Sequence, residues 1–181
     1  MAVRPQIGYR RGMDITQIIL EDHEDQRRMF ARLDDVDPQD IHALTALWTR
    51  LSNMLEVHAQ AEEDLFYPEL LELGKRRHEQ SEEEETKDAI GDHNDIRDGI
   101  LKARDSAVGS ADWWEGVNAA RHANDEHMGE EEHDGLRDFR LHVDLQVRHD
   151  IAVRFVAYEA EHVGGVPIVD KDPDDYVEEN S

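Results

Sequence analysis

The sequence predicts an all-α protein in which one helical hairpin occurs twice and is followed by a further helix and an acidic tail. Two observations lead to this prediction. Apolar residues recur at intervals of three and four along most of the chain, between helix-capping and helix-breaking signals. In addition, residues 22–27 match residues 92–97 at an offset of 70, and residues 58–63 match residues 127–132 at an offset of 69. The length of 181 residues fits a single domain.

The first hairpin is expected over residues 14–35 and 38–73. Asp14 and Gln17 have the spacing of a capping box, and apolar residues at helical spacing follow them. Asp37-Pro38 predicts a helix cap followed by proline at the first helical position. A long apolar stripe then continues to Gly74, where the second helix is expected to end.

The second hairpin begins after a charged linker at residues 75–85. Ser81 and Glu84 have capping-box spacing, and the third helix continues from there to a break at Gly109. Ser110 then caps a fourth helix. The acidic run at residues 82–85 is interpreted as a solvated helix N-terminus, which the helix dipole favours. The three tryptophans are predicted core residues: Trp48, Trp113 and Trp114.

The C-terminal region divides into two segments. Residues 141–163 alternate partly like a strand, but a single strand would have no pairing partner, so a helix packed on the repeated unit at residues 14–140 is expected. Residues 164–181 contain two prolines and many aspartates, and they predict an extended acidic tail.

Composition narrows the classes of function. The chain has 44 Asp and Glu against 20 Lys and Arg, a net charge of −24, so duplex nucleic acid and anionic membranes are not expected partners. The absence of cysteine excludes disulfides, thiolate nucleophiles and thiolate metal sites. There is no apolar stretch of membrane-spanning length and no signal-peptide pattern at the start, so we expect a soluble cytoplasmic protein. The sequence leaves open a homodimer or a protein partner.

Six polar residues of the repeat occupy positions where core side chains should lie. Each half contributes one helix with a single histidine and one helix with a histidine followed by glutamate four residues later, a spacing that places both on one helical face. A buried, unpaired carboxylate costs several kcal/mol or becomes protonated, whereas a metal ion would satisfy all six groups together. The candidate metal ligands are His23, His58, Glu62, His93, His127 and Glu131.

This four-part pattern resembles the hemerythrin-like, or HHE cation-binding, family over about residues 14–140. The most recognisable segment is residues 55–68, which read LEVHAQAEEDLFYP. The resemblance implies an up-down four-helix bundle around a non-haem di-iron centre with an oxo or hydroxo bridge. It further implies that Glu62 and Glu131 bridge the two irons and that the four histidines are terminal ligands.

One departure from the family pattern bears on function. Oxygen-carrying hemerythrins have a further histidine one turn after the histidine of the third helix, and this chain has Arg97 there. A centre that lacks one nitrogen ligand is more open, which favours reaction with O2, peroxide or nitric oxide over reversible carriage; whether the protein is an enzyme stays undecided. A second departure is the segment after Glu132, which leaves the end of the fourth helix uncertain. Glu63 and Glu132 lie five residues after their histidines and should point about 140° away from them.

Two other functions compete with this interpretation. A ferritin-like carboxylate site needs Glu-x-x-His pairs, which Glu130 with His133 and Glu159 with His162 provide. An iron-dependent sensor without turnover would use the same six ligands and a protein partner at the tail or last helix. The other histidines are interpreted as surface residues: His42, His78, His122, His133, His142, His149 and His162. For His122, a contact with one of the metal ligands is also left open.

Overall fold

The computed structural model describes residues 12–77 and 81–181, and no strand occurs among them. The prediction of an all-α protein is confirmed. His78, predicted to be a surface residue, lies outside the described residues. The helical elements are α1 (Ile15–Asp34), α2 (Ile41–Ala61), the π-helical segment η1 (Glu62–Phe66), α3 (Tyr67–Arg77), α4 (Ser81–Arg104), α5 (Ala111–His133), α6 (Gly135–His142), α7 (Leu145–Glu161) and α8 (Pro173–Asn180).

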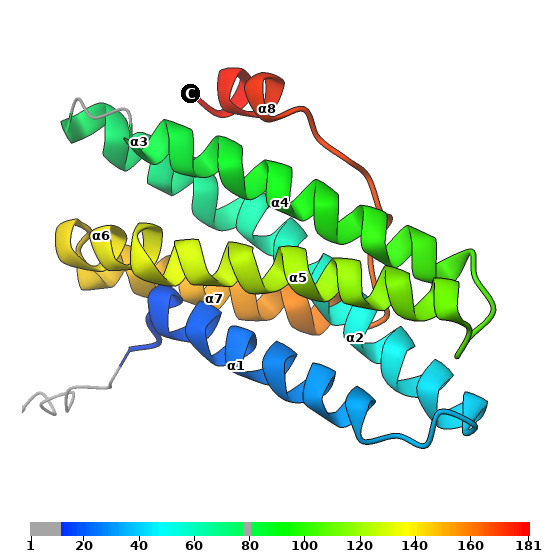
Figure 1. Cartoon of the computed structure of the whole chain (residues 1–181). Helices are drawn as coiled ribbons and strands as arrows, with labels where there is room; N and C mark the ends of the chain where they lie inside the picture. Colours follow the sequence, from blue (N-terminus) through cyan, green and yellow to red (C-terminus); the bar gives the residue numbers. More distant parts are fainter. Residues whose placement is uncertain (1–11, 78–80) are drawn as a thin grey trace, which may run out of the picture.

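Four long rods run side by side: α1, the continuous α2–η1–α3 rod, α4 and α5 (Figure 1). The contact between α4 and α5 is the closest, because it is made at glycines. A Cβ atom on Gly99 would lie 2.4 Å from the backbone nitrogen of Ala120, and one on Gly116 would lie 2.5 Å from that of Ala103. Larger residues at these two positions would therefore push the helices apart.

Several helix boundaries follow the predicted signals. The Asp14 carboxylate accepts a hydrogen bond from the Thr16 backbone N–H at 3.1 Å, and the Ser110 hydroxyl accepts one from that of Trp113 at 3.1 Å. Gly109 has a φ of 79°, a conformation in the left-handed region that favours glycine, so the predicted break between α4 and α5 has a backbone reason.

The second rod differs from its prediction in two details. It begins at Ile41 and not at Pro38, because the Asp40 carboxylate, which accepts from the Ala43 N–H at 3.0 Å, is the cap. It also continues past Gly74 to Arg77 and contains a wide turn, in which the Tyr67 N–H donates to the Glu62 carbonyl five residues earlier.

Two apolar clusters lie at opposite ends of the bundle, with a polar layer between them. One cluster includes Phe30, Trp48 and Trp113, and Trp114 packs at its margin. The indole rings of Trp48 and Trp113 meet edge to face, with their centroids 6.0 Å apart. The other cluster includes Phe66 and Phe155, and it connects α1, the α2–η1–α3 rod and α4 with α6, α7 and α8. The functional candidates occupy the layer between the clusters, where apolar packing on both sides limits water.

The structure corrects three expectations, two about the C-terminal region and one about the start of α4. The helix expected over residues 141–163 corresponds to α7, but it begins later, at Leu145, because residues 141 and 142 end α6. The tail is not extended throughout: Asp172 caps α8, Pro173 stands at its first position, and Tyr176 is buried. The acidic run at residues 82–85 is not fully solvated, because Glu82 is buried beside Arg77, with 3.3 Å between Oε1 and Nη1. Composition alone missed these contacts.

No helix of the described ranges 12–77 and 81–181 has the length and apolar character needed to cross a membrane.

Candidate metal centre

All six predicted ligands lie in the polar layer at the middle of the bundle. They come from four rods, with His23 on α1, His58 on α2, His93 on α4, His127 on α5, and the two glutamates on η1 and α5. Every one is buried, and the most exposed, Glu131, is only 8% exposed. The structure therefore brings the complete predicted set together.

Glu62 lies between two histidine pairs. Its Oε1 is 3.0 Å from Nε2 of His58, and its Oε2 is 3.3 Å from Nε2 of His93 and 3.7 Å from Nε2 of His127. The ring centroids of His23 and His58 are 5.2 Å apart, and those of His93 and His127 are 4.6 Å apart. One carboxylate thus faces both pairs, one oxygen toward each.

Unpartnered polar atoms collect at this point. Among the described residues, the buried atoms without a hydrogen-bond partner include Nε2 of His23 and His58, Oε1 of Glu62, and both carboxylate oxygens of Glu131. Such groups are expensive to bury unsatisfied. One ligand atom from each of His23, Glu62, His127 and Glu131 lies within 4.8 Å of all the others. Imidazole nitrogens and carboxylate oxygens in this arrangement fit a transition-metal ion.

Four further carboxylates stand behind the histidines. Glu132 Oε1 is 3.0 Å from Nδ1 of His23, and Glu63 Oε1 is 2.8 Å from Nδ1 of His93. Oδ2 of Asp22 lies 3.7 Å from Nδ1 of His58, and Oδ2 of Asp92 lies 3.7 Å from Nδ1 of His127. The two glutamates are within hydrogen-bond distance, which favours the tautomer that leaves Nε2 of His23 and of His93 free to bind a metal and holds each ring in orientation. The two aspartates lie near their histidines but beyond hydrogen-bond distance.

These four carboxylates were missed from the sequence, although the repeat contained the signal. Asp22-His23 recurs as Asp92-His93, and the paired glutamates recur at residues 62–63 and 131–132. Each aspartate serves a histidine of its own half, while each second glutamate serves a histidine of the other half. Glu63 and Glu132 point away from the ligand positions of their own helices, as expected. Each turns toward a histidine of a neighbouring helix.

Burial and close charges shift the pKa values of the cluster. Burial lowers the pKa of His23 to about 4, which keeps that imidazole neutral. Burial and the negative charge of Glu62 raise the pKa of Glu131 to about 8. For Glu62, burial alone would raise the pKa, but His58 and the other histidines around it hold it well below the usual range. For His127, burial is outweighed by Asp92 and Glu62, and the pKa rises to about 10. The group of carboxylates thus favours positive charge at its centre.

Arg97 does not point to the ligand positions. It is 0% exposed; its Nε lies 3.0 Å from Oε1 of Glu56, and its Nη2 donates to Glu63 at 2.9 Å. Burial raises the pKa of Glu56, and the Arg97 charge opposes that rise. The position that carries a ligand in the oxygen carriers is therefore used here for a buried ion pair that supports Glu63.

The C-terminal segment also contacts Glu63. Nζ of Lys171 lies 2.6 Å from its Oε2, and the Tyr176 hydroxyl donates to its backbone carbonyl. That carbonyl is open because the wide turn of η1 directs it toward residue 68, and Pro68 has no N–H to donate. The ring of Phe155 on α7 packs edge-on to His58, with 5.7 Å between the ring centroids.

The residues of the ferritin-like alternative do not gather in the bundle centre. Glu130 and His133 are exposed, and the His162 ring turns to the backbone carbonyl of Tyr158 at 2.7 Å. Glu159 approaches the site only from outside, with 3.8 Å between its Oε1 and Nδ1 of His58. His122, for which the sequence left open a contact with a metal ligand, is exposed and faces Glu126. The remaining described surface candidates are exposed or half-buried: His42, His142 and His149.

Comparison with known proteins gives one match. The family model described as the hemerythrin HHE cation binding domain matches residues 14–137. No curated protein and no solved structure matches the chain.

Proposed function

Because the chain belongs to the hemerythrin HHE cation-binding family, we propose that it holds two iron ions at this centre and uses them to bind or react with O2, peroxide or nitric oxide. The observation that carries the proposal is the cluster of buried, unpartnered ligand atoms around Glu62, with one histidine pair on each side. A pair of irons, when bound, supplies electrons to such a ligand or takes them back.

In this proposal the ions would be held by the histidines His23, His58, His93 and His127 together with Glu62 and Glu131. The glutamates at Nδ1 of His23 and His93 orient these imidazoles, and the apolar clusters limit the access of water from the two ends of the bundle. Since Arg97 is committed to Glu56 and Glu63, it supplies no fifth nitrogen ligand. The more open coordination that results favours reaction over carriage.

Tyr67 supplies a hydrogen-bond donor beside the centre. Its hydroxyl lies 3.5 Å from Oε2 of Glu62, and burial, together with Glu131 and Glu62, raises its pKa well above the usual value. The side chain therefore stays protonated and is able to donate a hydrogen bond to an anionic oxygen or nitrogen ligand.

Metal content tests the assignment directly. Protein reconstituted with iron should contain two irons per chain and show an oxidised-state absorption spectrum, whereas His58→Ala and Glu62→Ala should lose iron. His149→Ala, which alters a histidine far from the centre, should keep both irons. Retention of two irons by both ligand variants would refute the assigned site.

A sensor that binds iron without turnover is the second candidate function. The contacts of Lys171 and Tyr176 with Glu63 favour it, since they connect the state of the centre to the C-terminal segment. Repeated consumption of peroxide or nitric oxide would identify an enzyme. A stoichiometric, reversible spectral change with altered hydrogen exchange in residues 166–180 would identify a sensor.

A further inference from the structure

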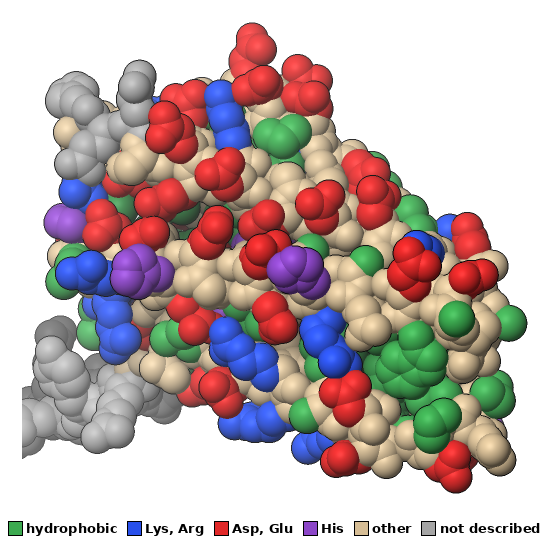
Figure 2. Space-filling view, in the orientation of Figure 1, with side chains coloured by type: hydrophobic (Ala, Val, Ile, Leu, Met, Phe, Trp, Pro, Cys, Tyr) green, Lys and Arg blue, Asp and Glu red, His purple; other side chains and the backbone are tan. Residues whose placement is uncertain are grey.

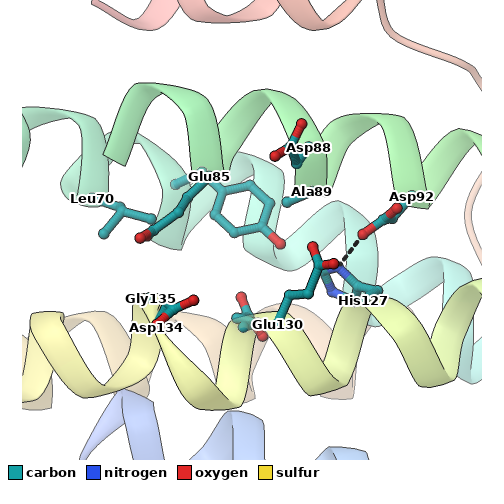
Figure 3. Close-up of a pocket in the computed structure, with 11 residues that line it drawn as sticks. Leu70, Glu85, Asp88, Ala89, Asp92, His127, Glu130, Asp134 and Gly135 are labelled. Carbon is teal, nitrogen blue, oxygen red and sulfur yellow. Dashed lines mark ion pairs between the residues drawn. The ribbon is translucent and has the colours of Figure 1, made fainter. Parts of the chain in front are cut away.

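A cavity of about 240 Å³ opens between α4 and α5 and extends to the candidate metal centre (Figure 3). Carboxylates predominate among the side chains that line it. The lining carboxylates are Glu85, Asp88, Asp92, Glu130, Glu131 and Asp134.

The carboxylates of this cavity are arranged in order of burial. Asp88, Glu130 and Asp134 are exposed and surround the mouth, Glu85 and Asp92 are half-buried, and Glu131 is buried at the inner end. Figure 2 shows acidic side chains over α4 and α5 on this face. Within the described ranges 12–77 and 81–181, no lysine or arginine lines the cavity. A positive ion therefore meets one carboxylate after another between the solvent and the centre.

Carboxylate oxygens without a hydrogen-bond partner lie along this cavity. Both oxygens of Glu131 are buried without a hydrogen-bond partner, as is Oε2 of Glu85. Burial, with Glu82 and Asp134 nearby, raises the pKa of Glu85 to about 7. In Figure 3 the Asp92 side chain reaches across from α4 to His127 on α5, which places a carboxylate directly beside a candidate ligand.

Side chains also cover other sides of the centre, and some of them are acidic: Asp22 and Glu159 lie 3.7 Å and 3.8 Å from Nδ1 of His58. Lys171 lies over Glu63 on the side of the C-terminal segment, and Phe155 covers His58 on the side of α7. On the α1 side, Nη2 of Arg27 lies 2.8 Å from the Glu132 carboxylate that faces His23. The cavity between α4 and α5 includes the candidate ligands His127 and Glu131 in its lining, whereas the grooves beside Lys171 and Arg27 include none of the six candidate ligands.

We propose that this cavity is the uptake route along which a hydrated divalent cation, ferrous iron, reaches the centre. The proposal rests on the proposed function, because it assumes that the centre binds iron. The exposed carboxylates raise the local concentration of the cation, and the buried ones replace its water as it moves inward. The histidines at the end then retain a transition metal in preference to magnesium or calcium, which favour oxygen ligands.

The rate of iron loading tests the route. Metal-free protein is mixed anaerobically with Fe2+, a chelator stops the reaction at set times, and protein-bound iron is counted. The test variant is Asp88→Asn/Glu130→Gln/Asp134→Asn. The matched control, Asp95→Asn/Asp98→Asn/Glu126→Gln, removes three exposed carboxylates from the same two helices beside a separate shallow groove.

We expect the test variant to load about tenfold more slowly than wild type, the control to stay within about twofold, and both to reach two irons per chain. Higher salt should slow wild type more than the test variant, because it screens the charges at the mouth. Equal loading rates in the two triple variants would overturn the route while leaving the proposed function intact. A wild-type chain that binds no iron would overturn both.

Discussion

Arg97 provides the sharpest prediction, because a fully buried arginine holds two buried glutamates. Arg97→Met removes the charge and keeps most of the side-chain volume. Breaking a buried ion pair by removing one partner costs about 3–5 kcal/mol. Here Glu63 would keep Lys171 at 2.6 Å and His93 at 2.8 Å, so only Glu56 loses its charged partner. We therefore expect a loss near the lower limit, about 3 kcal/mol in the free energy of unfolding.

Urea denaturation of metal-free protein, followed by helical circular dichroism, measures this loss. With a typical dependence of about 2 kcal/mol per molar urea, the midpoint should fall by about 1.5 M. Arg97→Met/Glu56→Met removes the stranded carboxylate as well and should recover most of the stability. Arg28→Met is the control, because Arg28 pairs with Glu24 and Asp25 in solvent and its loss should cost less than about 1 kcal/mol.

The reasoning fails if Arg97→Met costs no more than Arg28→Met. It fails equally if the double variant is less stable than Arg97→Met alone, since Glu56 would then be stabilised by something other than the arginine.

Three further predictions concern helix packing, the C-terminal segment and pH. Gly99→Ala should destabilise the protein by about 1–3 kcal/mol, because α5 leaves no room for a Cβ atom. Gly91→Ala, where the space is open, should stabilise the protein by up to about 1 kcal/mol. Equal effects of the two substitutions in thermal melts would contradict this. Lys171→Met removes the cation beside Glu63, and this variant should lose bound iron to a chelator up to about tenfold faster than wild type. An unchanged rate would show that the C-terminal segment does not support the centre. Glu85 has a folded pKa of about 7, above the usual 4.5, so its contribution to stability is present at low pH and is lost as pH rises toward 8. The stability of Glu85→Gln relative to wild type should therefore increase between pH 5 and pH 8 in urea denaturation without metal, and parallel pH curves would refute the raised pKa.

The predictable part of the fold rests on local signals. Ser110 and Gly109 marked a helix boundary because capping and left-handed backbone depend on one or two residues. His58 and Glu62 were placed on one face because any helix brings residues four apart together. The duplicated motif then indicated that the second half would repeat this arrangement.

The unpredicted features depend on contacts between distant segments. Composition indicated an extended tail, yet Tyr176 finds the Glu63 carbonyl that the wide turn and Pro68 leave open. Arg97 was recognised only as a missing ligand, because its partner Glu56 is 41 residues away in the sequence.

The amino-acid sequence by itself determined the helical class, the duplicated hairpin and the six candidate ligands, since each depends on periodicity within a helix or on the repeat. Only the tertiary structure decided which carboxylate orients which histidine and which side of the centre stays open. Glu132 and His23 are 109 residues apart, and Glu63 and His93 are 30 apart. Their meeting depends on how the rods rotate and pack, which no local spacing specifies.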